Sequence, residues 1–125
     1  MDVAVAYGGK AEDFGTPKDP MTGKRIGGVN VFGGGLALYA SDGTLLGGLG
    51  LSGDSSVADH IIAWKLRKKL GLDCVPGGVS STKDDNMVLD LVDGKSAGGW
   101  GHPATTPEAT RIVNELPKTH PLSKK

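Results

Sequence analysis

The segment from residue 33 to residue 71 constrains the fold most, because it carries the signals of a β-hairpin followed by one well-delimited helix. An apolar run beginning at Leu36 ends at Tyr39, and the Ser-Asp-Gly-Thr sequence at 41–44 supplies turn chemistry. Residues 45–51, in which leucine and glycine are interleaved, are expected to run back antiparallel to the first strand. The sequence therefore predicts a hairpin on which the rest of the chain packs.

A helix is expected directly after the hairpin, with a signal at each end. Ser56 stands three residues before Asp59, a spacing typical of a capping box, and Gly71 follows a last turn rich in lysine and arginine. The apolar row expected to cover one sheet face consists of Ala58, Ile62, Leu66 and Leu70, widened by Val57, Ile61 and Trp64. A second helix is expected to start at Thr106, with Pro107 at its first position, and to end at Pro117.

The other segments are more weakly patterned. Residues 1–26 are expected to form an arm or long loop containing a short strand at 3–7, and Val29 and Val31 indicate another short strand. Residues 83–86 are expected to be solvated, whereas 87–92 favour a further strand or a helical turn. Residues 118–125 are expected to be a disordered tail. The resulting prediction is one domain over 27–117, with three to four antiparallel strands and two helices.

Composition excludes several classes of function. Lysine plus arginine equals aspartate plus glutamate at 14 each, and aromatic residues make up 5% of the 125 residues, so nucleic-acid binding is disfavoured. No apolar run reaches the roughly 18 residues of a membrane span, and the N-terminus has no secretion-signal pattern. The single cysteine, Cys74, leaves no internal disulfide and is expected to be a structural thiol. A cytoplasmic location without membrane contact is expected.

The string from Gly48 to Gly53 matches the G-x-G-x-x-G pattern of dinucleotide-binding loops. Here, however, Gly48 and Gly50 alternate with leucines inside an expected strand, and a hairpin precedes them rather than a β-α unit. A nucleotide site is therefore disfavoured. A side-chain-free strip on one strand face is instead expected to accept a close neighbour, either a packed helix or a planar ligand.

Two histidines are candidates for chemistry. His60 follows Asp59 at a helix N-terminus, where the dipole favours the neutral imidazole that binds metal or accepts a proton, although a solvated or capping role is the alternative. His102 follows Trp100 in a glycine-rich loop that indicates either a binding loop or closure of the core edge. A zinc site formed by the two histidines is disfavoured, because neither belongs to a short ligand motif.

The strings at 33–39, 42–43, 46–54 and 58–60 resemble the second half of the GlcG/HbpS family, also called the haem-degrading domain family. The Gly-His-Pro string at 101–103 is similar to that of a longer branch of the family. The resemblance implies a profilin-like α/β (α+β) fold with helices packed on an antiparallel sheet, formation of oligomers, and binding of haem, another tetrapyrrole or a small ligand. Residues 1–26 stand where the family's usual N-terminal portion would be.

The leading functional prediction is a small-ligand-binding module of the haem-binding type that forms homo-oligomers. Its expected binding residues are Gly48, Gly50, Ser52, Gly53, Asp54, Asp59, His60 and His102. Ser52 and Asp54 would supply polar contacts, the helix N-terminus would attract a carboxylate, and a histidine would bind iron or a proton. One alternative is a small enzyme acting on a carboxylated metabolite, with His60 as base and Asp59 as its orienting partner. Another is a structural or interaction subunit without a ligand.

Overall fold

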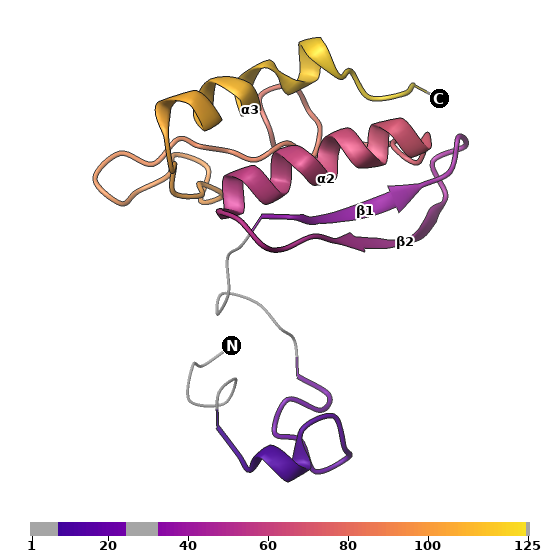
Figure 1. Ribbon diagram of the computed structural model, residues 1–125, viewed down its shortest axis with the longest axis vertical. Helices are drawn as coiled ribbons and strands as arrows, with labels where there is room; N and C mark the ends of the chain where they lie inside the picture. Colours follow the sequence, from indigo (N-terminus) through magenta and orange to yellow (C-terminus); the bar gives the residue numbers. More distant parts are fainter. Residues whose placement is uncertain (1–7, 25–32, 125) are drawn as a thin grey trace. The chain divides into compact units, whose positions relative to one another are not determined.

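The computed structural model describes residues 8–24 and 33–124, and the chain divides into two units, residues 1–31 and 32–125 (Figure 1). The described part of the first unit contains one 3-10 turn, η1 (Ala11–Asp13). The backbone N–H groups of Gly15 and Met21 each donate to the Asp19 carboxylate at 2.8 Å, and these bonds hold the pKa of Asp19 below its ordinary value. The strands expected at 3–7 and around Val29 and Val31 lie outside the described residues.

The second unit contains the predicted hairpin. Strands β1 (Gly35–Tyr39) and β2 (Leu45–Gly50) pair antiparallel, with an irregularity in register between Leu38 and Tyr39. In the turn, the Thr44 N–H donates to Asp42 Oδ1 at 2.8 Å, and Gly43 adopts a φ of 81°, which suits glycine. The local turn chemistry therefore brings the two apolar runs together as expected.

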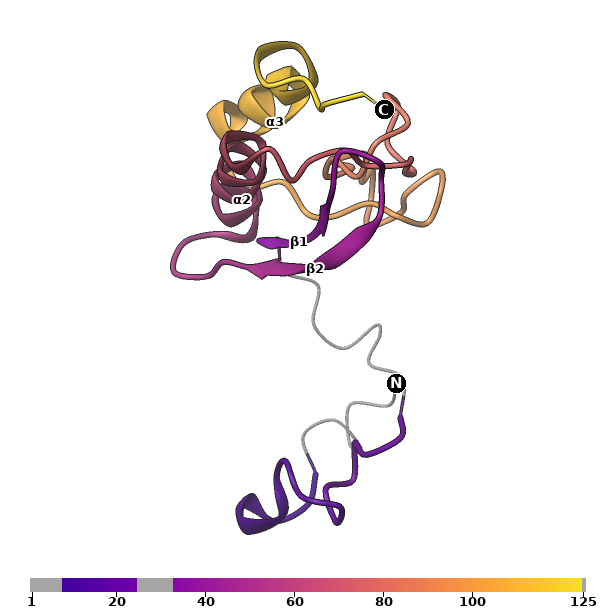
Figure 2. The same ribbon diagram turned by 90° about the vertical axis from the view of Figure 1, so that its right-hand side faces the viewer.

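Helix α2 (Ser56–Leu70) begins one residue earlier than the capping-box pattern predicted. The side chain of Ser55, not that of Ser56, accepts a hydrogen bond from the Ala58 N–H, so Ser55 is the N-cap. The expected C-terminal signal is confirmed, since Gly71 adopts a left-handed φ of 67° and its N–H bonds the carbonyls of the last turn. The helix lies between the hairpin and α3 (Pro107–Thr119) (Figures 1 and 2).

The predicted apolar face of α2 is confirmed in part. Val57, Ile61 and Trp64, which were expected to widen the apolar row, are buried. Within the row itself, however, Ile62 is 47% and Leu70 56% exposed. The core is made from three elements and consists of Val57, Ile61, Ala63 and Trp64 of α2, Leu36 of β1, and Val113 and Leu116 of α3. The helix therefore has apolar side chains on two faces, and its packing partners decide which face is buried.

Helix α3 starts as predicted but ends later. Thr106 is the N-cap and accepts from the Ala109 N–H, yet the helix continues past Pro117 to Thr119. Proline has no N–H, so the carbonyl of Val113 lacks its usual partner four residues later. The side-chain amide of Asn86 donates to that carbonyl at 2.9 Å. A residue of a distant loop thus satisfies the group that Pro117 leaves free.

The segment after α3 packs on the domain, in contrast to the expected disordered tail. The indole N–H of Trp64 donates to the carbonyl of His120 at 2.9 Å. The N–H of Ser123 donates to the buried carboxylate of Asp73 at 3.0 Å, and Leu122 packs against the core. Bonds from Ser123 and Lys68 hold the pKa of Asp73 below its ordinary value, although burial acts in the opposite direction.

The described residues between α2 and α3 contain no third strand. Residues 87–92 are not a strand, although Val92 and Lys95 form an isolated bridge around a turn at Asp93 and Gly94. Asp73 forms a second isolated bridge, parallel to Tyr39 at the end of β1. Within residues 8–24 and 33–124 the sheet has two strands, fewer than the three to four expected, so the fold is a small α+β arrangement. Residues 84 and 86 are buried rather than solvated. The Asp84 carboxylate accepts bonds within its own loop, and the Asn86 amide bonds to α2 and α3.

Candidate functional site

A cavity of about 530 Å³ opens between the loop at 79–90, the loop at 96–100 and α3. Its volume lies within the range of small-molecule sites, roughly 300–1,000 Å³. Neutral polar side chains, apolar side chains and one acid, Asp90, line it. The residues that we consider for recognition are Ser81, Thr82, Met87, Ser96, Trp100 and Asn114. No lysine or arginine contributes to the lining, so the cavity offers hydrogen bonds and an aromatic surface rather than positive charge.

Trp100 is held at this cavity with 66% of its surface exposed. Its position depends on Gly101, where a Cβ atom would come within 2.5 Å of Asp90 Oδ1 and 2.7 Å of Ser96 Cβ. The Gly101 N–H also donates to Ser96 Oγ at 3.0 Å. Only glycine therefore fits beside Trp100. The exposure of the indole agrees with a binding loop rather than with closure of the core edge.

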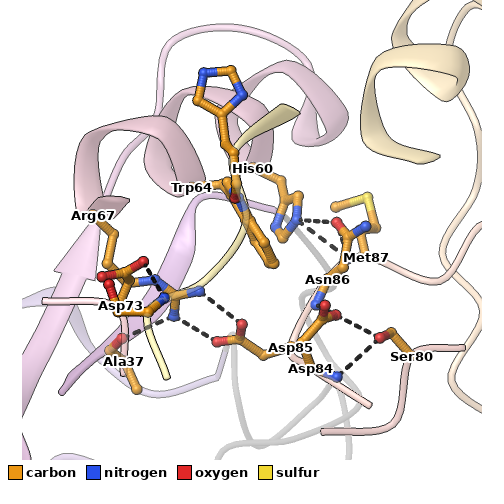
Figure 3. A network of polar contacts seen from close by, with 12 residues as sticks. Ala37, His60, Trp64, Arg67, Asp73, Ser80, Asp84, Asp85, Asn86 and Met87 are labelled. Carbon is orange, nitrogen blue, oxygen red and sulfur yellow. Dashed lines mark hydrogen bonds and ion pairs between the residues drawn. The ribbon is translucent and has the colours of Figure 1, made fainter. Parts of the chain in front are cut away.

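Asn86 lines the cavity, and Figure 3 shows its contacts with His60 and Met87. Besides its bond to Val113, its Oδ1 lies 2.9 Å from His60 Nε2 on α2, and the Met87 N–H donates to Oδ1 at 3.0 Å. Both ends of the amide are thus engaged. His60 lies directly behind this wall, and burial lowers the pKa of its imidazole, which favours the neutral ring.

The loop that leads to Asn86 is organised by the carboxylate of Asp84. Ser80 Oγ donates to Asp84 Oδ1 at 2.5 Å, and Thr82 Oγ1 donates to Oδ2 at 2.8 Å. The Asn86 N–H adds a bond to Oδ1 at 3.0 Å. Because these bonds close a compact turn, the cavity rim is fixed before any ligand enters.

A buried arginine connects the same loop to α2 and β1 (Figure 3). Arg67 is fully buried, and its two terminal nitrogens donate to the Asp85 carboxylate at 2.6 and 2.7 Å. One nitrogen also donates to the Ala37 carbonyl at 3.0 Å, and the guanidinium lies 5.3 Å from the Trp64 ring centroid. This bidentate geometry is the strongest form of the ion pair. The sequence indicated only a dipole-stabilising cation at this position.

The site residues predicted from sequence do not gather at this cavity; none of the eight lines it. Ser52, Gly53 and Asp54 are exposed between β2 and α2. Asp59 is buried, and its Oδ1 accepts from the Asp54 N–H at 3.2 Å, so it stabilises the loop before α2. His60 therefore has Asn86, rather than the expected Asp59, as its polar side-chain neighbour.

The glycine strip also differs from expectation. A Cβ at Gly50 would meet no described atom within 4 Å, and one at Gly48 would reach only Leu36 O at 4.0 Å. The close backbone approach occurs instead at Gly34, where a Cβ would collide with the carbonyl of Leu51, and at Gly33, where it would collide with that of Ser56. The glycines before β1, not those within β2, allow the tight packing.

The two histidines do not fit the role of an iron ligand in this structure. His60 is 4% exposed, and its Nε2 is within hydrogen-bond distance of Asn86 Oδ1 and of the Met87 N–H. His102 is also buried, and its Nδ1 lies 2.8 Å from the Pro103 carbonyl oxygen. The backbone N–H of His102 donates to the Val88 carbonyl. Across the described ranges, no three or more His, Cys, Asp or Glu side chains group closely enough to hold a metal ion.

Polar residues at 80–86 were missed because Ser, Thr, Asp and Asn there have the composition of a solvated loop. One signal in their favour was Pro117, whose missing N–H leaves a carbonyl that another polar side chain must satisfy.

Among residues 8–24 and 33–124, no helix combines the length and apolar character needed to cross a membrane. No family model, curated protein or solved structure matches this chain.

Proposed function

We propose that this chain is a small-ligand-binding module and that its ligand enters the cavity beside Trp100. The observation that carries the proposal is the exposed indole at a cavity of about 530 Å³. An indole that is exposed at the mouth of a cavity offers its face for stacking on a ligand ring. The wall behind it is held by Asn86 and Asp84, so little ordering entropy opposes binding.

The lining favours a flat ring with hydrogen-bonding substituents. Trp100 would stack on the ring, and Ser81, Ser96 and Asn114 would bond to its edge. A tetrapyrrole is the ring class that the GlcG/HbpS resemblance of residues 33–60 implies. Because His60 and His102 are engaged elsewhere, binding should depend on the ring rather than on iron.

The test compares haemin with metal-free protoporphyrin IX, each titrated against the full chain and followed by the Soret band. We expect both to bind with similar affinity. Trp100→Ala should weaken both by about tenfold, because the stacking surface is lost. The matched control is Val92→Ala, which alters a side chain that is 71% exposed in the same loop but does not line the cavity.

Each outcome is informative. Binding of haemin alone would mean that iron is ligated and that the histidines rearrange. Binding of neither molecule would reject the tetrapyrrole class, and equal affinities for Trp100→Ala and the parent chain would reject the cavity as the site.

We further propose that two copies associate through β2. Within the described residues β2 pairs only with β1, and Leu45 and Leu46 are 62% and 59% exposed. Residues 45–52 contain no charged residue and no proline, the usual means of protecting a free edge. Antiparallel pairing of β2 with its own copy around a two-fold axis would give a four-stranded sheet, closer to the proposed profilin-like layer.

A further inference from the structure

We propose that a second cavity, of about 540 Å³, binds organic carboxylates that have an apolar body. This cavity adjoins the proposed ring site, with which it shares Thr82 and Pro117 in its lining. Its walls are formed by the segment after α2, the turn at 82–84 and the residues that follow α3. The apolar part of the lining consists of Val75, Pro76, Pro117, Pro121 and Leu122.

Two lysines, Lys83 and Lys124, also line this cavity. Within residues 8–24 and 33–124 neither ammonium group has a hydrogen bond or ion pair. The acid in the lining, Asp84, already accepts bonds from Ser80, Thr82 and Asn86. The cavity therefore combines an apolar wall with two cations that lack a described anion.

The backbone at Lys83 supports a role for its side chain. Its φ is 61°, a left-handed conformation that a side chain with a Cβ disfavours. The Lys83 N–H donates to Ser80 O, and the Ser80 N–H donates to Asp84 O, which is the pattern of a turn that ends in a left-handed residue. Glycine or asparagine fits this position without strain. A lysine at the cavity, held in a strained conformation, indicates that the ammonium group is used.

On each side of the cavity, a lining residue is in contact with a residue outside the lining. At Gly78 a Cβ would collide with the backbone of Asp84, so the segment that carries Val75 passes close to the lysine turn. On the other side, the bond from the Ser123 N–H to Asp73 fixes the backbone immediately before Lys124. The two ammonium groups are thus attached to backbone segments whose positions are determined.

Charge and surface together define the ligand. Two ammonium groups suit a carboxylate, and the proline and leucine wall suits a hydrocarbon chain rather than a small inorganic anion. Octanoate combines both features and is the probe. Acetate keeps the charge without the body, and octanol keeps the body without the charge.

The experiment titrates these three compounds into the full chain by isothermal calorimetry, below the concentration at which octanoate aggregates. We expect octanoate to bind at least tenfold more tightly than acetate or octanol. Lys83→Asn and Lys124→Gln should each weaken octanoate binding about tenfold. Lys83→Asn should also leave the melting temperature unchanged or raise it, because asparagine accepts the left-handed backbone.

The matched control is Lys65→Gln, which removes an exposed lysine of α2 outside the cavity and should leave octanoate affinity unchanged. Trp100→Ala should also leave it unchanged, which distinguishes this site from the proposed ring site. The proposal is overturned if octanoate does not bind, if octanol binds equally well, or if the two cavity variants retain the parent affinity.

Discussion

At the level of single residues, the adjacent serines Ser55 and Ser56 have different roles at the start of α2. Ser55 accepts the Ala58 N–H at the start of α2, whereas Ser56 is the first helical residue. We expect Ser55→Ala to lower the free energy of unfolding by about 1 kcal/mol, and Ser56→Ala by less than about 0.5 kcal/mol. Urea denaturation of both variants measures this, and a larger loss for Ser56→Ala would contradict the observed cap.

His60 makes stability depend on pH in a definite direction. Burial lowers its pKa in the folded chain below the usual 6.5, so the unfolded chain binds the proton more readily. The free energy of unfolding should therefore be level above about pH 7 and fall as pH drops below 6.5, by at most about 1.4 kcal/mol per pH unit. Urea denaturation between pH 5 and 8 measures the slope.

The control for this pH effect is His60→Gln, which can bond to Asn86 but does not titrate. Its slope below pH 6.5 should be shallower than that of the parent chain. Asp73 acts in a separate window, because its lowered pKa contributes stability that is lost only as pH falls below 3.8. Equal slopes for His60→Gln and the parent chain between pH 5 and 6.5 would mean that His60 is not the group responsible.

At the level of elements, the hairpin distinguishes glycines that are needed from glycines that are not. Gly34 has a φ of 87° and lies against the Leu51 carbonyl, so Gly34→Ala should cost about 2–4 kcal/mol. Gly50 is open, so Gly50→Val should change stability by less than about 0.5 kcal/mol, contrary to the expectation of a crowded strip. Thermal and urea unfolding of both variants decide the matter; a severe loss for Gly50→Val would mean that β2 packs against an undescribed neighbour.

The elements themselves could be predicted from sequence, since their signals are local. The hairpin depends on a turn sequence, and each helix depends on capping residues within a few positions of its ends. The limits of the buried face of α2 could not be predicted, because Trp64 and Ile62 were both expected on the apolar face and only Trp64 is buried. The choice follows from contacts with β1, α3 and Asp85, which are remote in sequence.

The candidate site was harder to predict for the same reason. His60 was singled out for its place at a helix start, but its neighbours in space are Asn86 and Met87, from a segment that looks solvated. The side-chain amide of Asn86 donates to the Val113 carbonyl, which has no helical partner because Pro117 lacks an N–H. Such a match links two residues with no shared local pattern, so only the three-dimensional arrangement reveals it.

At the level of the whole molecule, the edge of β2 that is unpaired within residues 8–24 and 33–124 predicts self-association. Sedimentation equilibrium at micromolar concentration should give twice the 12.8 kDa chain mass. Leu46→Lys should shift the equilibrium to monomer, because it places like charges in facing strands. Ile62→Lys, on the outer face of α2, should leave the dimer intact. A dimer that only Ile62→Lys disrupts would place the interface on α2 instead, and a monomeric parent chain would reject self-association.

The segment after α3 has a consequence for the order in which the chain matures during synthesis. The indole N–H of Trp64 bonds to the carbonyl of His120, 56 residues later in the chain. The carboxylate of Asp73 accepts from the N–H of Ser123, 50 residues later. The hairpin and α2 are encoded together and can form while translation continues. Their buried polar groups acquire these partners only after residues 120–123 have left the ribosome. Until then, the hairpin and α2 lack the partners that these two buried polar groups have in the folded domain.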